Sequence, residues 1–169
     1  MSNSQVNISR RQLFTRRKDS DKPNLPWVKD HLFTDLCTQC GKCVEACPEK
    51  IIQPSDGGFP RVDFNLGECT FCYQCAETCP ESISFNGSTA LFNPKTEKPW
   101  QAKAVISEQC LAQQNVDCRS CGDSCEPFAI RFKLAVGSVA QPQIDTNLCN
   151  GCGACVSVCP TQAINVKLI

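Results

Sequence analysis

The spacing of the sixteen cysteines constrains this chain of 169 residues more than any other feature. Three groups share the pattern C-x2-C-x2-C-x3-C-P: motif one is Cys37, Cys40, Cys43 and Cys47, motif two is Cys69, Cys72, Cys75 and Cys79, and motif four is Cys149, Cys152, Cys155 and Cys159. Motif three keeps the later spacings but has a first gap of seven residues: Cys110, Cys118, Cys121 and Cys125. With gaps of two residues, three cysteine side chains in one tight loop can converge on one face of a small bound group.

This run is typical of the cysteines that hold 4Fe–4S clusters in bacterial ferredoxins. A secreted disulfide scaffold is disfavoured, because no apolar stretch is long enough for a signal peptide and cysteines in close triplets are poor disulfide partners. A zinc site is disfavoured as well, since zinc motifs usually join two short knuckles across a gap of a dozen or more residues. We therefore predict iron–sulfur clusters.

Charge is distributed unevenly along the chain, although the formal net charge is zero. Residues 1–30 contain seven Lys or Arg against three Asp, so this segment has a net charge of +4 and the remainder −4. Clusters bound by thiolates add further negative charge, so we expect an acidic body with a basic arm. This polarity suits docking to a protein partner and gives no support to nucleic-acid binding.

Internal repetition divides the chain into two modules. Motif one maps onto motif two by a shift of 32 residues, and the last three cysteines of motif three map onto motif four by a shift of 34. We predict an α+β fold of tandem bacterial-ferredoxin-like modules, with short strands and helices around a core made mostly of clusters. The expected units are a basic arm at 1–30, a two-cluster module at 31–90, a connector at 91–104 and a second two-cluster module at 105–169. Near the connector, Phe92 and Trp100 are expected to pack on a module.

The cluster ligands are expected to cross between motifs, because in two-cluster ferredoxins the fourth cysteine of a run binds the other cluster. We predict four 4Fe–4S clusters on this basis. The first module would use Cys37, Cys40, Cys43 with Cys79, and Cys69, Cys72, Cys75 with Cys47. The second module would use Cys110, Cys118, Cys121 with Cys159, and Cys149, Cys152, Cys155 with Cys125. Crossing ties the halves of a module together and brings its two clusters close enough for electron transfer.

Motif three departs from the pattern and leaves two interpretations open. Its long first gap and the Glu126 that replaces proline after Cys125 are compatible with a surface insertion that keeps all four ligands, since loops tolerate insertion at small entropic cost. Alternatively, Cys110 is a loose ligand, and the cluster of motif three is labile or transferable.

Longer phrases in the sequence add a family resemblance to the cysteine pattern. They are SRRQLF, Pro26-Trp27, CTFCYQCAETCPES, CLAQQNVDCRSCGDSCEP, and QPQI followed by LCNGCGACVSVCP. Together they resemble the NapF family, the ferredoxin-type accessory proteins encoded with periplasmic nitrate reductases. The resemblance implies a cytoplasmic protein that helps to mature the precursor of the catalytic nitrate reductase subunit before its export, by cluster assembly or redox preparation.

The amino-terminal arm contains a pair of arginines that resembles a twin-arginine export signal, Arg10 and Arg11. Export is disfavoured because the segment 15–22 that follows is charged and not apolar. One interpretation is a solvated basic tail. The other, implied by the resemblance, is an arm that docks the nitrate reductase precursor through Arg10 and Arg11, with Leu13 and Phe14 as apolar anchors.

No constellation in the sequence indicates an enzyme. The single histidine, His31, has no partner pattern of a general base, and no dinucleotide or P-loop fingerprint is present. We also find no stretch long enough for a membrane span. Two functions remain, an assembly factor for the nitrate reductase precursor and an electron carrier between a quinol-linked, membrane-associated donor and a redox partner.

Overall fold

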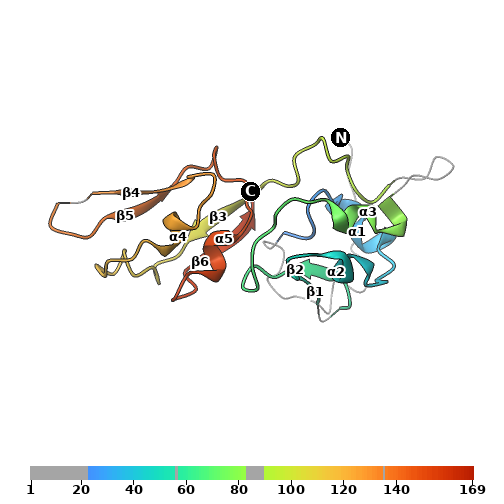
Figure 1. The fold of residues 1–169 in the computed structure, drawn as a ribbon, viewed down its shortest axis with the longest axis horizontal. Helices are drawn as coiled ribbons and strands as arrows, with labels where there is room; N and C mark the ends of the chain where they lie inside the picture. Colours follow the sequence, from blue (N-terminus) through green and yellow to red (C-terminus); the bar gives the residue numbers. More distant parts are fainter. Residues whose placement is uncertain (1–22, 56, 83–89, 135) are drawn as a thin grey trace, which may run out of the picture.

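The second module has the complete alternation of strands and helices that the repeat predicts. The structure is a computed structural model that describes residues 23–55, 57–82, 90–134 and 136–169, and Figure 1 shows its two lobes, one for each module. In the second lobe the elements follow in the order β3 (Ala102–Ile106), α4 (Ser120–Asp123), β4 (Ile130–Lys133), β5 (Gln141–Ile144), α5 (Ala154–Ser157) and β6 (Ile164–Leu168).

Two antiparallel strand pairs hold this module. The outer pair joins its first and last strands, β3 and β6, in a register that runs from Ala102↔Leu168 to Ile106↔Ile164. The inner pair, β4 and β5, forms a hairpin (Figure 1). Side chains alternate across the outer pair, so Ala104 and Val166 point into the core, where each is buried.

In the described residues, the first module has the inner hairpin and no strand pair around it. Its elements are α1 (Asp30–Leu36), α2 (Lys42–Ala46), β1 (Ile52–Pro54), β2 (Pro60–Val62), α3 (Gln74–Glu77) and the 3-10 helix η2 (Pro80–Ser82). Strands β1 and β2 pair antiparallel from Ile52↔Val62 to Pro54↔Pro60. In the place of an outer pair, the described residues of this module contain one isolated bridge between Val28 and Phe92.

Aromatic packing closes the first module around that bridge. Trp27 is 3% exposed, and its ring makes an edge-to-face contact with Tyr73 at 4.9 Å between centroids. The Trp27 indole N–H donates to the carbonyl of Glu97 at 2.9 Å, and the N–H of Asn93 donates to the carbonyl of Trp27 at 2.7 Å. Phe92 is buried, as predicted. The segment that follows the first module thus packs along Trp27.

The fold is the predicted α+β arrangement of short elements. Every described α-helix has between four and seven residues, so none could be stable without the tertiary contacts of its module. The strand β3 begins at Ala102, inside the range expected as connector. No helix among the described residues combines the length and the apolar character that crossing a bilayer requires.

Candidate iron–sulfur sites

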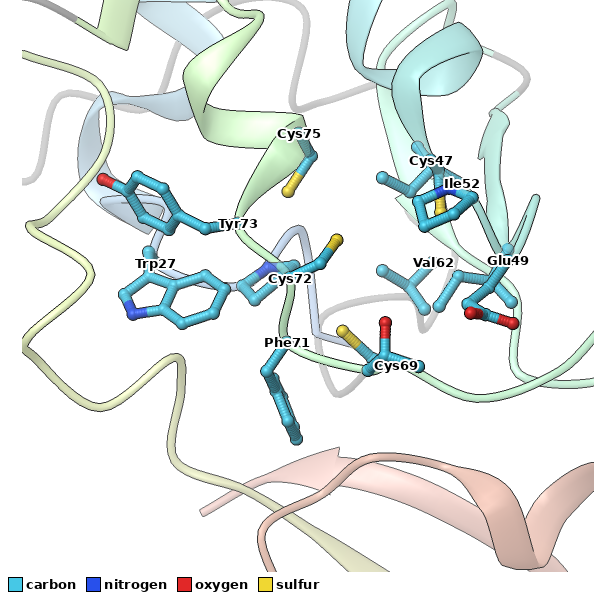
Figure 2. A pocket seen from close by; sticks show the side chains of 14 residues that line it. Trp27, Cys47, Glu49, Ile52, Val62, Cys69, Phe71, Cys72, Tyr73 and Cys75 are labelled. Carbon is cyan, nitrogen blue, oxygen red and sulfur yellow. The ribbon is translucent and has the colours of Figure 1, made fainter.

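A cavity in the first module is lined by four cysteines that belong to one crossed set. Figure 2 shows the side chains of Cys47, Cys69, Cys72 and Cys75 around this cavity, with their sulfur atoms directed into it. Three of them come from the loop before α3 and from its first turn, and Cys47 follows α2. Ile52 and Val62 of the inner hairpin add an apolar wall. We call these four cysteines the inner set of the first module.

A second cavity, in the second module, repeats this arrangement. Its cysteines are Cys125, Cys149, Cys152 and Cys155, which is again three residues of one motif with the fourth residue of its neighbour. Ala129, Ile130 and Val166 are among the apolar residues that line it. We call these four cysteines the inner set of the second module.

The remaining eight cysteines belong to two predicted outer sets with the same crossed membership. Burial, together with the neighbouring thiols of Cys37, Cys79 and Cys40, raises the pKa of Cys43 to about 11. These four residues are the outer set of the first module.

The outer set of the second module is recognised in the same way. Burial, together with the neighbouring thiols of Cys110, Cys118 and Cys159, raises the pKa of Cys121 to about 11. Cys110 is therefore near enough to raise the pKa of Cys121, as Cys118 and Cys159 of its predicted set are, despite the long gap that precedes Cys118.

The surroundings of the inner sets disfavour the charged thiolate form of their cysteines when no cation is nearby. Burial is the main cause that raises the pKa of Cys75 and of Cys155 to about 12. The neighbouring cysteines raise it further, because their thiolates would carry negative charge. A thiolate in such a place needs a compensating positive charge, and bound iron supplies one because metal ligation displaces the thiol proton. The donor sets therefore fit iron, which binds cysteine as thiolate.

A cluster requires a different arrangement of thiols from a single metal ion. Among the described residues, no group of three or more His, Cys, Asp or Glu side chains is arranged to hold one metal ion. In a 4Fe–4S cubane each cysteine binds a different iron, so the four sulfur atoms stand further apart than around one zinc ion. A cluster bound there would supply one-electron chemistry.

The loops of motifs one, two and four share an unusual backbone conformation. The residue after the second cysteine has a left-handed conformation in each: Gly41 (φ 76°), Tyr73 (φ 75°) and Gly153 (φ 86°). This conformation starts the following short helix in a direction that turns its first residues back toward the cysteines. It is costly for Tyr73, whose side chain is held by its contacts with Trp27 and by a hydrogen bond from its hydroxyl to the carbonyl of Asn93.

Motif three reaches the same cysteine grouping with a different backbone. The corresponding residue, Arg119, has φ −131° and is not left-handed. The inserted segment is anchored by Ala112, which is 1% exposed and whose carbonyl accepts a hydrogen bond from the Gln141 side chain at 2.7 Å. The insertion is therefore an ordered turn that rests on the end of the β4–β5 hairpin.

Backbone N–H groups also point at cysteine sulfur atoms. The N–H of Ala163 donates to Cys159 Sγ at 3.2 Å, and the N–H of Ala104 donates to Cys149 Sγ at 3.5 Å. Hydrogen bonds of this kind stabilise negative charge on sulfur and raise the reduction potential of a cluster.

Two other sequence predictions concern the amino-terminal arm and the single histidine. Arg10, Arg11, Leu13 and Phe14 lie outside the described residues. His31 is exposed on α1.

A group of aromatic residues lies between the modules, and the cysteine pattern gave no indication of it. Phe64 and Phe71 of the first module both contact the ring of Trp100, at 5.9 Å between centroids. The signal was present in motif two, where Phe71 and Tyr73 occupy loop positions that are glycine in motif four.

Comparisons with known proteins agree with the cysteine chemistry. Residues 36–83 match the family described as a 4Fe-4S dicluster domain, and residues 142–165 match the 4Fe-4S binding domain. The two matched ranges contain motifs one, two and four and leave out motif three. The chain is thus a ferredoxin-type protein that binds 4Fe–4S clusters.

Relatives that span nearly the whole chain define the family more closely. The chain is 43% identical over 167 residues to the ferredoxin-type protein NapF of Escherichia coli K12, with 97% of each chain covered. It is 48% identical over 143 residues to NapF of Haemophilus influenzae, which covers 84% of this chain and 77% of that relative. A more distant relative, the ferredoxin-type protein NapG of Escherichia coli K12, is 25% identical over 155 residues. The chain belongs to the NapF family of ferredoxin-type proteins.

Proposed function

We propose that the chain holds four 4Fe–4S clusters, one in each crossed cysteine set. The observation that supports this most directly is the pair of cavities, each lined by three cysteines of one motif and the fourth cysteine of its neighbour. The raised pKa values of Cys43 and Cys121, to which the thiols of the two outer sets contribute, support the same assignment for those sets.

The clusters would serve the maturation of another protein. We propose that the chain is a cytoplasmic accessory protein that prepares the precursor of the periplasmic nitrate reductase catalytic subunit, by assembling its 4Fe–4S cluster or by setting its redox state before export. Membership of the NapF family supports this function, together with the basic segment at 1–30, which suits a protein partner. The chain itself would catalyse no separate reaction and would bind no nucleic acid.

Cluster transfer distinguishes this function from simple electron carriage. Anaerobic holoprotein labelled with 55Fe is mixed with the apo form of the nitrate reductase subunit, and the two are then separated. We expect labelled iron and sulfide to appear in the subunit. Reduction of a cluster that the subunit already holds, without any movement of label, would instead identify an electron carrier.

The amino-terminal arm gives a second test of the same function. We propose that Arg10, Arg11, Leu13 and Phe14 dock the precursor. Deletion of residues 1–20 should weaken capture of the precursor in a pull-down and should leave the iron content unchanged. Undiminished capture would reduce the arm to a solvated tail.

The electron carrier remains the second candidate because one observation favours it. The backbone N–H of Cys69 donates a hydrogen bond of 2.8 Å to the carbonyl of Cys152, so the inner sets of the two modules meet. Four clusters in such an order would conduct electrons from one end of the molecule to the other, for instance from a membrane-associated quinol-linked donor. The label-transfer experiment separates the two candidates.

A further inference from the structure

The contact between the two modules is made by residues that belong to the proposed cluster sites. Cys69 is in the inner set of the first module and Cys152 is in the inner set of the second, and a backbone hydrogen bond joins them. A covalent and hydrogen-bonded route therefore runs from one sulfur through two peptide groups to the other. No such direct hydrogen bond joins the two outer sets among the described residues.

Three aromatic rings surround this contact. The ring of Phe64, which is 7% exposed, meets the Trp100 ring edge-on at 79°, and the Phe71 ring meets it at 77°. Figure 2 shows Phe71 directed away from the four sulfur atoms of its own cavity. The indole N–H of Trp100 donates to the carbonyl of Asn150 at 3.1 Å, two residues before Cys152. The rings thus connect the motif-two loop to the motif-four loop.

Two glycines of motif four allow this approach. A Cβ atom at Gly153 would overlap the ring of Phe64, and a Cβ atom at Gly151 would lie 2.9 Å from the indole nitrogen of Trp100. Motif two has aromatic residues at the equivalent positions, Phe71 and Tyr73. The motif-two loop therefore has aromatic side chains at the positions where the motif-four loop has glycine. The space left by the glycines accommodates aromatic rings, so the surfaces of the two modules are complementary.

We infer that Phe64, Phe71 and Trp100, packed against the backbone of Gly151 and Gly153, fix the two inner cysteine sets against each other as one electron-exchange unit. The inference rests on the proposed cluster sites and extends to either proposed function. Exchange moves one electron from the cluster of one inner set to the cluster of the other, and requires no proton or additional reactant. The molecule would then behave as one four-cluster protein and not as two independent ferredoxins.

The experiment compares Gly153→Ala with Gly41→Ala in the full-length holoprotein. Both glycines follow the second cysteine of their motif and have a positive φ, so the backbone strain of alanine is matched. Only Gly153 has a neighbour from the other module, because a Cβ at Gly41 meets nothing within 4 Å. Iron and sulfide are counted first, and the reduced proteins are then compared by paramagnetic resonance for magnetic interaction between clusters.

The magnetic interaction between the two clusters of one module contributes equally to the spectra of the parent protein, Gly41→Ala and Gly153→Ala. We expect Gly41→Ala to retain the full broadening and splitting of the parent signal, and Gly153→Ala to lose the part that arises between modules. Equal spectra for the two variants at full iron content would overturn the inference. Too little iron in the parent protein would instead contradict the four-cluster proposal, so the two failures are distinguishable.

Trp100→Ala provides a second variant in case Gly153→Ala loses iron from its own loop. Trp100 lies outside all four motifs and supplies no cysteine ligand, so its removal changes no residue of the cysteine loops. It deletes the ring that contacts Phe64 and Phe71, together with the hydrogen bond to the carbonyl of Asn150 in motif four. We expect the same loss of interaction between modules at an unchanged iron count. An unaltered spectrum would show that the aromatic contact does not couple the inner sets.

Discussion

The two modules place their cysteines alike, but in the described residues different contacts close them. The second module is enclosed by the pairing of β3 with β6, which extends over five residue pairs. The first has a single bridge between Val28 and Phe92 in that place, with Trp27 packed beside it, among the residues that the structure describes. Both nevertheless contain a cavity lined by a crossed set of four cysteines.

The comparison distinguishes the structural elements that both cluster sites share from the elements that close only one module. The cysteine loops, the short helix after each and the inner hairpin occur in both modules, so they form the common scaffold of the sites. In the described part of the chain the outer strands occur in only one module, where a two-stranded pair has little stability by itself. In the described residues, a strand pair closes one module, and aromatic packing beside a single bridge closes the other.

Removal of iron should have the largest effect on stability. It should unfold both modules, whichever contacts close them. Anaerobic chelation of the holoprotein leaves sixteen thiols, including buried ones such as Cys75 whose surroundings disfavour charge. We expect both modules to unfold together, since small domains built around bound metal are commonly unfolded without it. Amide hydrogen exchange of the apo chain should be fast throughout, including in β3 and β6. Slow exchange confined to those two strands would mean that the strand pair, and not the cluster, holds the second module.

Replacement of Cys110 should remove one cluster and so test whether motif three is equivalent to motif one. Because Cys110 acts on the pKa of Cys121 together with Cys118 and Cys159, we expect Cys110→Ser to lose about a quarter of the iron, the share of one cluster in four. The matched control is Cys37→Ser, the corresponding first cysteine of the regular motif. If Cys37→Ser loses this iron and Cys110→Ser does not, Cys110 is no ligand.

Truncation of Trp27 should weaken the first module alone. Loss of a buried aromatic side chain typically costs about 3–5 kcal/mol, and here it also removes the edge-to-face contact with Tyr73. We expect Trp27→Ala to lower the denaturant concentration at which the clusters bleach, with faster hydrogen exchange in β1 and β2 before β3 and β6. Leu66→Ala is the control, because Leu66 is 55% exposed in the same module and should have little effect. Equal effects of the two substitutions would remove Trp27 as the element that closes this module.

The smallest effect is expected at the anchor of the motif-three insertion. Gln141→Ala removes the hydrogen bond to the carbonyl of Ala112, a loss of about 0.5–1.5 kcal/mol. We expect slightly faster loss of one cluster in air, measured by visible absorbance. Gln143→Ala is the control, since Gln143 is an exposed glutamine on the same strand. Identical rates for the two variants would mean that the anchor does not protect the cluster.

The sequence predicts the sites better than it predicts the closure of the modules. Cysteine spacing is a local property, and each cavity is lined by four cysteines that the spacing and the crossing of the fourth cysteine assign to one predicted set. The α+β class follows from the same repetition. Local pattern could not reveal that β3 pairs with β6, because the two strands are separated by most of the module and meet only through the fold.

The first module shows a second limit of sequence analysis. The pairing of Trp27 with a segment more than sixty residues later in the chain leaves no periodic signal. The contact of Phe64 with Trp100 is equally hard to predict from the sequence, because each residue considered alone resembles an ordinary core residue. Aromatic residues at the loop positions of motif two were the available clue, because the other motifs have small or polar residues there.

The central claim is that four crossed cysteine sets each hold a 4Fe–4S cubane, whichever way a module is closed. Quantification of iron and acid-labile sulfide in anaerobically purified protein, with the paramagnetic resonance of the reduced form, tests it most directly. We predict about sixteen iron and sixteen sulfide per chain, with resonances of reduced 4Fe–4S clusters. A compactly folded protein that contains neither iron nor sulfide would contradict the claim.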